Sequence, residues 1–446
     1  MRRIVFALLP LLVLATPHLL RAQDPEGVRL GLLYQSEYQP GIVVLPVAAI
    51  PNLARAASTI QTVIRQDLDY SDYFQIRTGT EGVRAGDPVN LKLWKERGAD
   101  WVVESSLTPR AGGVSLHLVL HDAVYGQKKG DQVFLLPPEG DPGFRMAVHA
   151  TADELVRWAT GELGGAASRI AFVLEGRGSR EIYLVDSDGE NVQRVTNDGS
   201  FALTPAWSPD GTRIAYTSYR AGRPILYERD LRTGRDRVLS EREGMNTTPA
   251  YSSDGQLLAF ATTVSGNVEV ATVGRGGGSL QQQTHGRRFD SLAPSFSPDG
   301  RSLAFVSNRL GEPAVYVMSL GGEARLVSDY AYGKTRLNTS PDWSPKGGEI
   351  AYHSGSKGVY DIMLVDLAKG TRRLLTNVGS NEDPSWGPDG RHLVFSSRDR
   401  EGGGLFVLDT VTGRVRPLLR GKGYGLPDWS GTLFRAQSIA RAPSGG

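Results

Sequence analysis

One short phrase occurs six times between residues 205 and 431, and no other feature constrains the fold as strongly. It reads "PAWSPDG" at Pro205 and returns as "PAYSSDG", "PSFSPDG", "PDWSPKG", "PSWGPDG" and "PDWSG". Successive copies lie 43 to 47 residues apart, and short apolar runs such as "IAYTS" and "LAFVS" follow them. A fixed period of this length indicates a row of similar units that bury their apolar faces against one another. The aromatic residues of the phrase are Trp207, Tyr251, Phe296, Trp343, Trp386 and Trp429.

Each repeat contains four short strand candidates separated by turn residues. In the unit that begins at Pro205 they are Pro205–Ser208, Arg213–Ser218, Pro224–Arg229 and Arg237–Ser240. Pro, Asp and Gly at the second, third and fourth positions of the turn suit a type I β-turn. Four-stranded units at this period are typical of a β-propeller, whose blades stack radially around a channel. Six copies therefore predict six blades.

The first and last repeats are out of phase in a way that favours a closed ring. The last aromatic strand, near Trp429, has no partner strands after it, and three strands lack an inner strand before them: Ile170–Leu174, Ile182–Asp186 and Val192–Thr196. Joining the two incomplete sets makes one blade from both ends of the domain, which removes exposed sheet edges. An open β-solenoid is the alternative, but a solenoid does not need this offset.

The region before the repeats is expected to form a small α/β domain. Strand-like runs begin at Ile42, Trp101 and Val114, and helical spacing marks "STIQTVIRQDL" and Phe144–Glu162. The predicted fold is an α/β N-terminal domain followed by an all-β six-bladed β-propeller with one blade closed by strands from both ends. The expected boundaries are a signal peptide at 1–22, the N-terminal domain at 23–165, the propeller at 166–433 and a mobile tail at 434–446.

The first 25 residues, "MRRIVFALLPLLVLATPHLLRAQDP", are typical of a Sec-type secretory signal, with cleavage expected after Ala22. The chain contains no cysteine, so neither a disulfide nor a lipid-modified cysteine is expected. A formal net charge of only +2 gives no electrostatic reason to expect nucleic-acid binding. In a Gram-negative cell these features place the chain in the periplasm.

The sequence does not predict an enzyme. No G-x-S-x-G motif is present, and the glycine-rich "GRGGGS" lacks the Lys-Ser/Thr pair of a phosphate-binding loop. His117 and His121 share one strand face without an evident third ligand, and His149 and Asp153 suit helix packing with an i,i+4 hydrogen bond. We therefore expect no catalytic residues, no cofactor and no metal ion.

Binding of another protein is the expected role instead. The six loops that lead into the inner strands converge at the mouth of a propeller channel, and a ring of this kind suits the docking of one protein. These channel-mouth loops are Phe201–Thr204, Gly244–Thr248, Phe289–Ala293, Arg336–Ser340, Asn381–Asp383 and Gly423–Leu426.

The order of signal peptide, small α/β domain and six "SPDG"-type blades resembles the TolB family of the Tol-Pal envelope system. The resemblance covers nearly all of the mature chain and includes "GIVVLPV", "IRQDLDYSDYF", "GADWVV", "HATADELVRWATGELG" and "RIAFV". It implies a periplasmic, monomeric protein without enzymatic activity. It also implies binding of the lipoprotein Pal at the channel mouth and of TolA through the mature N-terminus, in support of outer-membrane integrity and constriction at cell division.

The resemblance also implies which residues contact each partner. The Pal face takes in Met245, Asn246, Thr247, Thr248, Leu292, Asn338, Thr339, Asn381, Glu382 and Asp383. The TolA segment takes in Gln23, Asp24, Pro25, Glu26, Gly27 and Val28. Two alternatives stay open: a propeller that belongs to a periplasmic peptidase, and a binding propeller for a different ligand.

Overall fold

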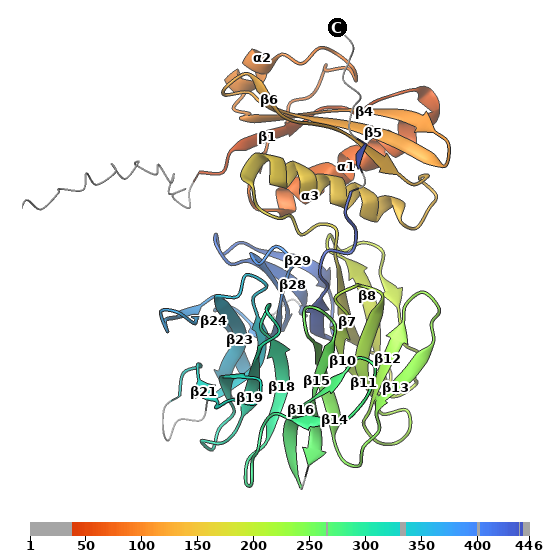
Figure 1. Cartoon of the computed structure of the whole chain (residues 1–446). Coiled ribbons are helices and arrows are strands. Elements are labelled where there is room, and N and C mark those ends of the chain that lie inside the picture. The colour runs from red at the N-terminus through yellow and green to blue at the C-terminus, as the bar shows by residue number, and fades with distance from the viewer. Residues whose placement is uncertain (1–37, 265, 331–335, 399–401, 437, 440–446) are drawn as a thin grey trace, which may run out of the picture. The chain divides into compact units, whose positions relative to one another are not determined.

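The computed structural model describes residues 38–264, 266–330, 336–398, 402–436 and 438–439 (Figure 1). The expected signal peptide and the segment Gln23–Val28 lie outside these residues. Among the helices in the described ranges, none is both long enough and apolar enough to cross a membrane.

The N-terminal domain is a mixed sheet with two long helices on one face (Figure 1). The strand order is β3-β1-β4-β5-β6-β31, with β2 beside β4; β1 runs parallel to β3 and β4, and the pairs from β4 through β6 are antiparallel. The strands are β1 Gly41–Val44, β2 Ala48–Ala49, β3 Gln75–Ile76, β4 Trp101–Arg110, β5 Gly113–Asp122, β6 Gln127–Leu136 and β31 Ser438–Ile439. The helices are the 3-10 turn η1 Pro51–Leu53, α1 Ala54–Tyr70, α2 Leu91–Glu96 and α3 Phe144–Thr160.

The two long helices form where the sequence predicts them, because their apolar residues fall on one face. In α1 the buried residues include Ala57, Ile60 and Ile64, which pack with α3 against the sheet. At the far end of α3, Gly161 takes a φ of 80° and its N–H donates to the Arg157 carbonyl, which ends the helix. Both predicted helices are confirmed, although α3 ends two residues earlier than expected.

The propeller has six four-stranded antiparallel blades, as predicted. Blade one is β10 Ala202–Trp207, β11 Arg213–Ser218, β12 Ile225–Asp230 and β13 Asp236–Ser240; blade two is β14 Asn246–Tyr251, β15 Leu257–Val264, β16 Asn267–Gly274 and β17 Gln281–Gln282; blade three is β18 Ser291–Phe296, β19 Ser302–Ser307, β20 Ala314–Ser319 and β21 Arg325–Leu326. Blade four is β22 Leu337–Trp343, β23 Glu349–Ser356, β24 Val359–Asp366 and β25 Arg372–Leu374; blade five is β26 Ser380–Trp386, β27 His392–Arg398, β28 Gly404–Asp409 and β29 Val415–Arg420.

Blade six confirms the predicted closure from both ends of the domain. Its inner strand β30 (Tyr424–Trp429) pairs antiparallel with β7 (Arg169–Glu175), which is followed by β8 (Arg180–Asp186) and β9 (Gln193–Arg194). Strands more than 250 residues apart in the sequence are thus neighbours in one sheet, and the ring has no open edge between its first and last blades.

The blades pack through a repeated pairing of small and large side chains. An alanine on the second strand of five blades is fully buried, with Val394 in the same place in blade five. Four of the six repeat aromatics are also buried, whereas Tyr251 and Trp343 are only half-buried. Four of the six repeat aromatics therefore belong to the buried core between blades. The alanines are Ala171, Ala215, Ala259, Ala304 and Ala351.

The "SPDG" turns have one internal hydrogen-bond scheme, which explains why the phrase recurs. In blade one the Ser208 hydroxyl donates to Asp210, whose carboxylate also accepts from the Thr212 N–H, and Gly211 takes a φ of 67°. Blade five has Gly387 in place of the serine, and Asp389 of that turn contacts His392 instead. This departure frees the blade-five turn for contacts with the N-terminal domain.

The segment after Trp429, expected to become a mobile tail at residue 434, runs back to the N-terminal domain. The Leu433 N–H donates to the Ala167 carbonyl, and Phe434 and Ala436 pack against the core of the N-terminal domain. Ser438 and Ile439 then pair with β6 as the seventh strand of the sheet. Exposed sheet edges favour such pairing, and this pairing was not foreseen from the sequence.

Candidate functional site

The inner strands of all six blades share an unusual backbone conformation at the channel mouth. The residue before the repeat proline has a positive φ of 48° to 54° in every blade, a region that is disfavoured for non-glycine residues and more so before proline. The strand pairing shifts register at the same point in each blade. Six such bulges line a central hollow of about 290 Å³. The residues are Thr204, Thr248, Ala293, Ser340, Asp383 and Leu426.

Two carboxyl groups lie deeper along this hollow and tie neighbouring blades together. Asp342 accepts from the Trp386 N–H and Asp428 accepts from the Trp207 N–H, both at 2.7 Å. Both side chains line the hollow and are half-buried, so the surface that they expose faces the interior of the ring. This burial raises the pKa of Asp428 to about 8, and the neighbouring Asp342 adds to the effect.

Three of the expected Pal-face residues, Asn246, Asn338 and Asn381, are buried and support the loops from within. The Asn246 amide donates to the Arg242 carbonyl at 2.7 Å, and the Asn381 amide donates to the Val378 carbonyl at 3.0 Å. These asparagines shape the channel-mouth loops and expose almost none of their own surface. Their side chains are consistent with turn formation.

The remaining expected Pal-face residues are half-buried and linked from blade to blade. Thr247 accepts from Thr217 of blade one, and Thr248 accepts from the Ala293 N–H of blade three at 3.1 Å. In blade four, Thr339 contacts His353, whose Nδ1 accepts from the Asp383 N–H of blade five at 3.0 Å. Met245 and Leu292 belong to the same ring of loops. The structure thus brings these residues together on one rim, and side-chain contacts link it at three of the six blade boundaries.

Glu382 and Asp383 also line a groove of about 490 Å³ between blades five and six. Three cationic side chains, Arg180, Arg398 and Lys422, share its lining, and Arg398 pairs with Glu382. The groove therefore carries charges of both signs beside the channel mouth. The groove adjoins the central hollow, because Asp383 and Leu426 line both.

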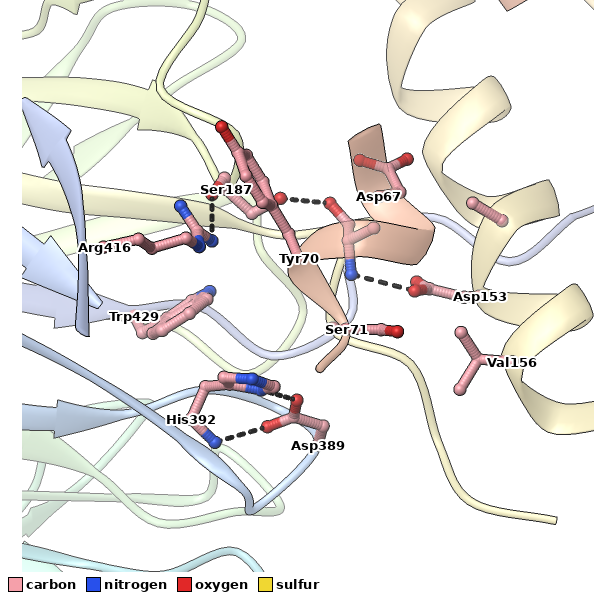
Figure 2. Close-up of a pocket in the computed structure, with 13 residues that line it drawn as sticks. Asp67, Tyr70, Ser71, Asp153, Val156, Ser187, Asp389, His392, Arg416 and Trp429 are labelled. Carbon is pink, nitrogen blue, oxygen red and sulfur yellow. Dashed lines mark hydrogen bonds and ion pairs between the residues drawn. The ribbon is translucent and has the colours of Figure 1, made fainter. Parts of the chain in front are cut away.

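A second hollow, of about 30 Å³, lies where α1, α3 and the linker meet blades five and six (Figure 2). Asp153 of α3 accepts from the linker N–H groups of Ala166 and Ala167 at 2.8 and 2.9 Å. On the propeller side, Arg416 donates to the Ser187 carbonyl and lies 3.9 Å from the ring centre of Tyr70. Burial raises the pKa of Asp153 to about 7.

Two buried histidine–carboxylate clusters flank this hollow. His149 with Asp67 and Asp188 forms one, and His392 with Asp72 and Asp409 forms the other; in each cluster the potential ligand atoms lie within 4.8 Å of one another. Arginines contact the same carboxylates: Arg145 pairs with Asp188, Arg391 with Asp409 and Arg414 with Asp72. The guanidinium groups supply the positive charge that a metal ion would otherwise bring, so we interpret both clusters as ion-pair networks.

The partners of three histidines differ from the expectation. His149 and Asp153 do not form the expected i,i+4 hydrogen bond; His149 contacts Asp67, 82 residues earlier, at 2.7 Å. Burial lowers the His149 pKa, but Asp67 outweighs this and raises it to about 9. His117 and His121 do have carboxylates beside them, Asp131 at 2.6 Å and Glu104 at 2.7 Å. These partners come from β6 and β4, and no local spacing could have indicated them.

The contacts between blade five and α1 were also missed by reasoning from the sequence. His392 lies between Asp389 of its own turn and Asp72 at the end of α1. The one available signal was that "GPDGRH" departs from the "SPDG" pattern. This turn lacks the serine and has Arg391 and His392 instead, and both of these residues contact Asp72.

Comparison with known proteins agrees with this architecture. The family model described as the TolB beta propeller domain matches residues 157–433, and the model of the TolB amino-terminal domain matches residues 35–129. The crystal structure of TolB from Acinetobacter baumannii superposes with a TM-score of 0.77 at 25% sequence identity, covering 89% of this chain and 97% of that one.

Curated relatives give the same picture over a shorter span. The chain is 32% identical over 212 residues to the Tol-Pal system protein TolB of Polaromonas sp., covering 46% of this chain and 49% of that protein. It is 33% identical over 230 residues to the TolB of Desulfosudis oleivorans, covering 48% and 50%. The chain thus aligns with about half the length of these relatives. Because the propeller model alone matches more than half of its residues, the chain belongs to the TolB family.

Proposed function

We propose that this chain is a periplasmic component of the Tol-Pal system that acts by binding other proteins and catalyses no reaction. In this proposal a Pal-like lipoprotein docks on the channel mouth, and a TolA-like inner-membrane protein binds the N-terminal segment Gln23–Val28. The protein, a monomer, would thereby support outer-membrane integrity and constriction at cell division. Membership of the TolB family supports the system, while the partners themselves are part of the proposal.

The rim of six channel-mouth loops is the observation that carries the proposal. Side-chain contacts link these loops at three blade boundaries: Thr217 of β11 contacts both Thr204 and Thr247, Thr248 accepts from the Ala293 N–H, and Ser340 donates to Asp383. A surface that is already ordered loses little conformational entropy when a protein docks on it. The alternatives of a peptidase propeller and of a propeller for a different ligand lack a comparable observation in their favour.

Binding of the soluble domain of the same organism's Pal-like lipoprotein tests the docking face. We expect the double substitution Thr247→Arg with Leu292→Arg to weaken binding at least about tenfold, because both half-buried residues lie on the rim. Leu374→Arg is the matched control, since this exposed leucine lies on the outermost strand of blade four. Equal affinity of both folded variants in calorimetry would place the docking face elsewhere.

The N-terminal contact needs a separate measurement. We expect deletion of Gln23–Val28 from the mature chain to abolish binding of a TolA-like domain and to leave binding of the Pal-like domain within about twofold. Because Gln39 begins the compact unit that holds both domains, the deletion leaves that unit intact. Retained binding of the TolA-like domain would remove this contact from the proposal.

A further inference from the structure

Blades one and three carry the same aromatic platform with an arginine above it. Tyr216 stacks on Tyr227 in blade one with ring centres 5.9 Å apart, and Phe305 stacks on Tyr316 in blade three at the same distance. The guanidinium carbon of Arg220 lies 3.8 Å from the ring centre of Tyr227, and that of Arg309 lies 4.6 Å from the ring centre of Tyr316. The two arginines are therefore equivalent members of the repeat.

In blade one, two carboxylates neutralise the arginine. Arg220 donates to Asp198 at 3.2 Å and to Asp236 at 2.8 Å. The Ser218 hydroxyl also donates to Asp198, and Arg229 shares Asp236. The Arg220 guanidinium thus stacks on an aromatic ring and donates charge-assisted hydrogen bonds to two carboxylates at its edge.

In blade three both carboxylates are replaced. In blade one Tyr227 pairs with Val238, and Asp236 lies two residues before Val238. In blade three Tyr316 pairs with Leu326, and Ala324 lies two residues before Leu326. Ala324 is therefore the equivalent of Asp236. Asp198 comes two residues after Thr196, whose hydroxyl donates to Glu181. In blade three, the equivalent hydroxyl of Thr284 donates to Glu269, and the residues that follow in that loop are His285, Gly286, Arg287 and Arg288.

Arg309 consequently lacks an acidic partner within the described residues. Its Nε donates to the Ser307 hydroxyl at 3.2 Å, and no described carboxylate oxygen lies within 4.0 Å of the guanidinium. Its surroundings are aromatic: the ring centres of Phe289 and Phe305 lie 4.9 and 5.5 Å away. Burial lowers the pKa of Arg309, and the charges of Tyr316 and Glu269, which forms no ion pair with it, oppose this lowering without cancelling it.

A second polar group at this place is also without a partner. The Tyr316 hydroxyl is buried, the residue is 3% exposed, and no described atom hydrogen bonds to that hydroxyl. Buried polar groups are usually paired, so an unpaired hydroxyl beneath a guanidinium that has no acidic partner among the described residues calls for an explanation. Arg287 and Arg288 are exposed in the adjoining loop and have no ion pair with any described residue.

The site borders the channel mouth. Ser307, two residues before Arg309, pairs with Ser291, and the next residue of β18 is Leu292 on the expected docking rim. We propose that Arg309, together with Arg287 and Arg288, binds a carboxylate side chain presented by the protein that docks on this face. Blade one shows which ligand fits, because there the chain's own carboxylates occupy the equivalent place. Only the identity of the docked protein rests on the proposed function.

The test supplies blade three with the carboxylate that blade one already has. In Ala324→Asp, the new aspartate should pair with Arg309 and exclude the carboxylate of the docked protein. Arg309→Ala removes the guanidinium altogether. The matched control is Ala221→Asp, the same change at an exposed residue beside the already neutralised Arg220. Equal melting temperatures, or a higher one for Ala324→Asp, would show that the variants fold.

Two probes make the outcome decisive. With the soluble Pal-like domain, we expect Ala324→Asp and Arg309→Ala to weaken binding roughly ten- to hundredfold and Ala221→Asp to leave it unchanged. Affinities equal to the wild type in both site variants would overturn the carboxylate site while leaving the proposed function intact.

If the wild-type chain does not bind the Pal-like domain, the proposed function fails and a hexaglutamate peptide decides the site. The Nε–Hε resonance of Arg309 should then shift on titration in the wild type and in Ala221→Asp, and should not shift in Ala324→Asp. A hexalysine peptide provides the negative control. No shift in the wild type at millimolar hexaglutamate would overturn the proposal.

Discussion

The residue after the repeat proline decides how each blade joins the next. Asp342, Asp428, Ser295 and Ser385 each accept a hydrogen bond from the backbone N–H of the aromatic residue in a neighbouring blade. At the other two junctions this position is an alanine, Ala206 or Ala250, which has no acceptor to offer. The residue after the repeat proline thus indicates which blade junctions have a side-chain hydrogen bond: an aspartate or serine provides one, and an alanine does not.

Asp428 should make the stability of the propeller depend on pH. Its pKa rises from 3.8 to about 8 on folding, so the folded chain holds a proton that the unfolded chain releases above pH 4. The free energy of unfolding should fall between pH 4 and pH 8, by at most about 1.4 kcal/mol per pH unit. Asp428→Asn keeps the acceptor for the Trp207 N–H and should remove this slope.

Urea denaturation of both proteins at pH 4, 6 and 8 checks this expectation. The two stabilities should be similar at pH 4, where the carboxyl group is protonated, and the variant should be the more stable at pH 8. Wild-type stability that does not fall relative to the variant over this window would show that the folded carboxyl group ionises normally.

At the scale of elements, the repeat aromatics hold neighbouring blades together to different extents. Trp386 is 4% exposed and its indole N–H donates to the Asp342 carbonyl of the preceding blade. Trp386→Ala should therefore lower the free energy of unfolding by about 3–5 kcal/mol. Trp343→Ala is the matched comparison, because Trp343 is half-buried, and its loss should be smaller. Equal losses in chemical denaturation would contradict the link to burial.

The contact between α1 and blade five should add a second pH dependence. Asp389 and Asp72 raise the pKa of the buried His392 from 6.5 to about 9, against the opposing effect of burial. This interaction stabilises the fold fully below about pH 6.5 and is lost as the pH rises through 9. The His392→Gln variant should be less stable than the wild type at pH 6. Between pH 7 and pH 10 its melting temperature should fall less than that of the wild type, as thermal denaturation would show.

The elements that the sequence predicts well are those set by local chemistry. The propeller blades follow from turn residues and alternating apolar strands within about 45 residues, and α1 and α3 follow from helical periodicity. By contrast, β6 has two lysines and Gly130 in its first half and is a strand because it pairs with β5. A Cβ at Gly130 would come within 2.2 Å of the Trp158 ring of α3, a constraint invisible in the local pattern.

The same distinction applies to the candidate sites. The six channel-mouth loops were predictable because each one precedes a copy of the repeat. Among the described residues, the missing acidic partner of Arg309 becomes visible only when strand register equates Ala324 with Asp236, and the His149–Asp67 contact joins residues of two helices that lie 82 positions apart. Reasoning from one sequence therefore finds the loops at the channel mouth more readily than the charged contacts that depend on strand pairing.

At the scale of the whole molecule, the C-terminal segment connects the two domains a second time. The first connection is the linker after α3. In this linker the N–H groups of Ala166 and Ala167 donate hydrogen bonds to the Asp153 carboxylate. The second runs from the inner strand of blade six through Leu433 and Phe434 to β31. Two covalent paths between domains restrict their relative motion more than one linker does.

Truncation after Gly431 should separate these two connections. The shortened chain keeps all strands of the propeller and loses only the half-buried Leu433 from its core, so the propeller should unfold at a temperature within a few degrees of the full-length value. The N-terminal domain loses Phe434 and Ala436 from its core and the β31 partner of β6. Hydrogen exchange should therefore accelerate at the β6 amides that pair with β31, while exchange at the amides between β4 and β5 changes less.

Phe434→Ala in the full-length chain distinguishes packing from strand pairing. It removes a half-buried ring from the N-terminal core and leaves the backbone of β31 able to pair with β6. We expect it to lower the stability of the N-terminal domain by about 1–3 kcal/mol and to leave β6 protected from exchange. If exchange at β6 were instead unchanged by the truncation, the C-terminal strand would add nothing to the sheet in solution, and the linker alone would join the two domains.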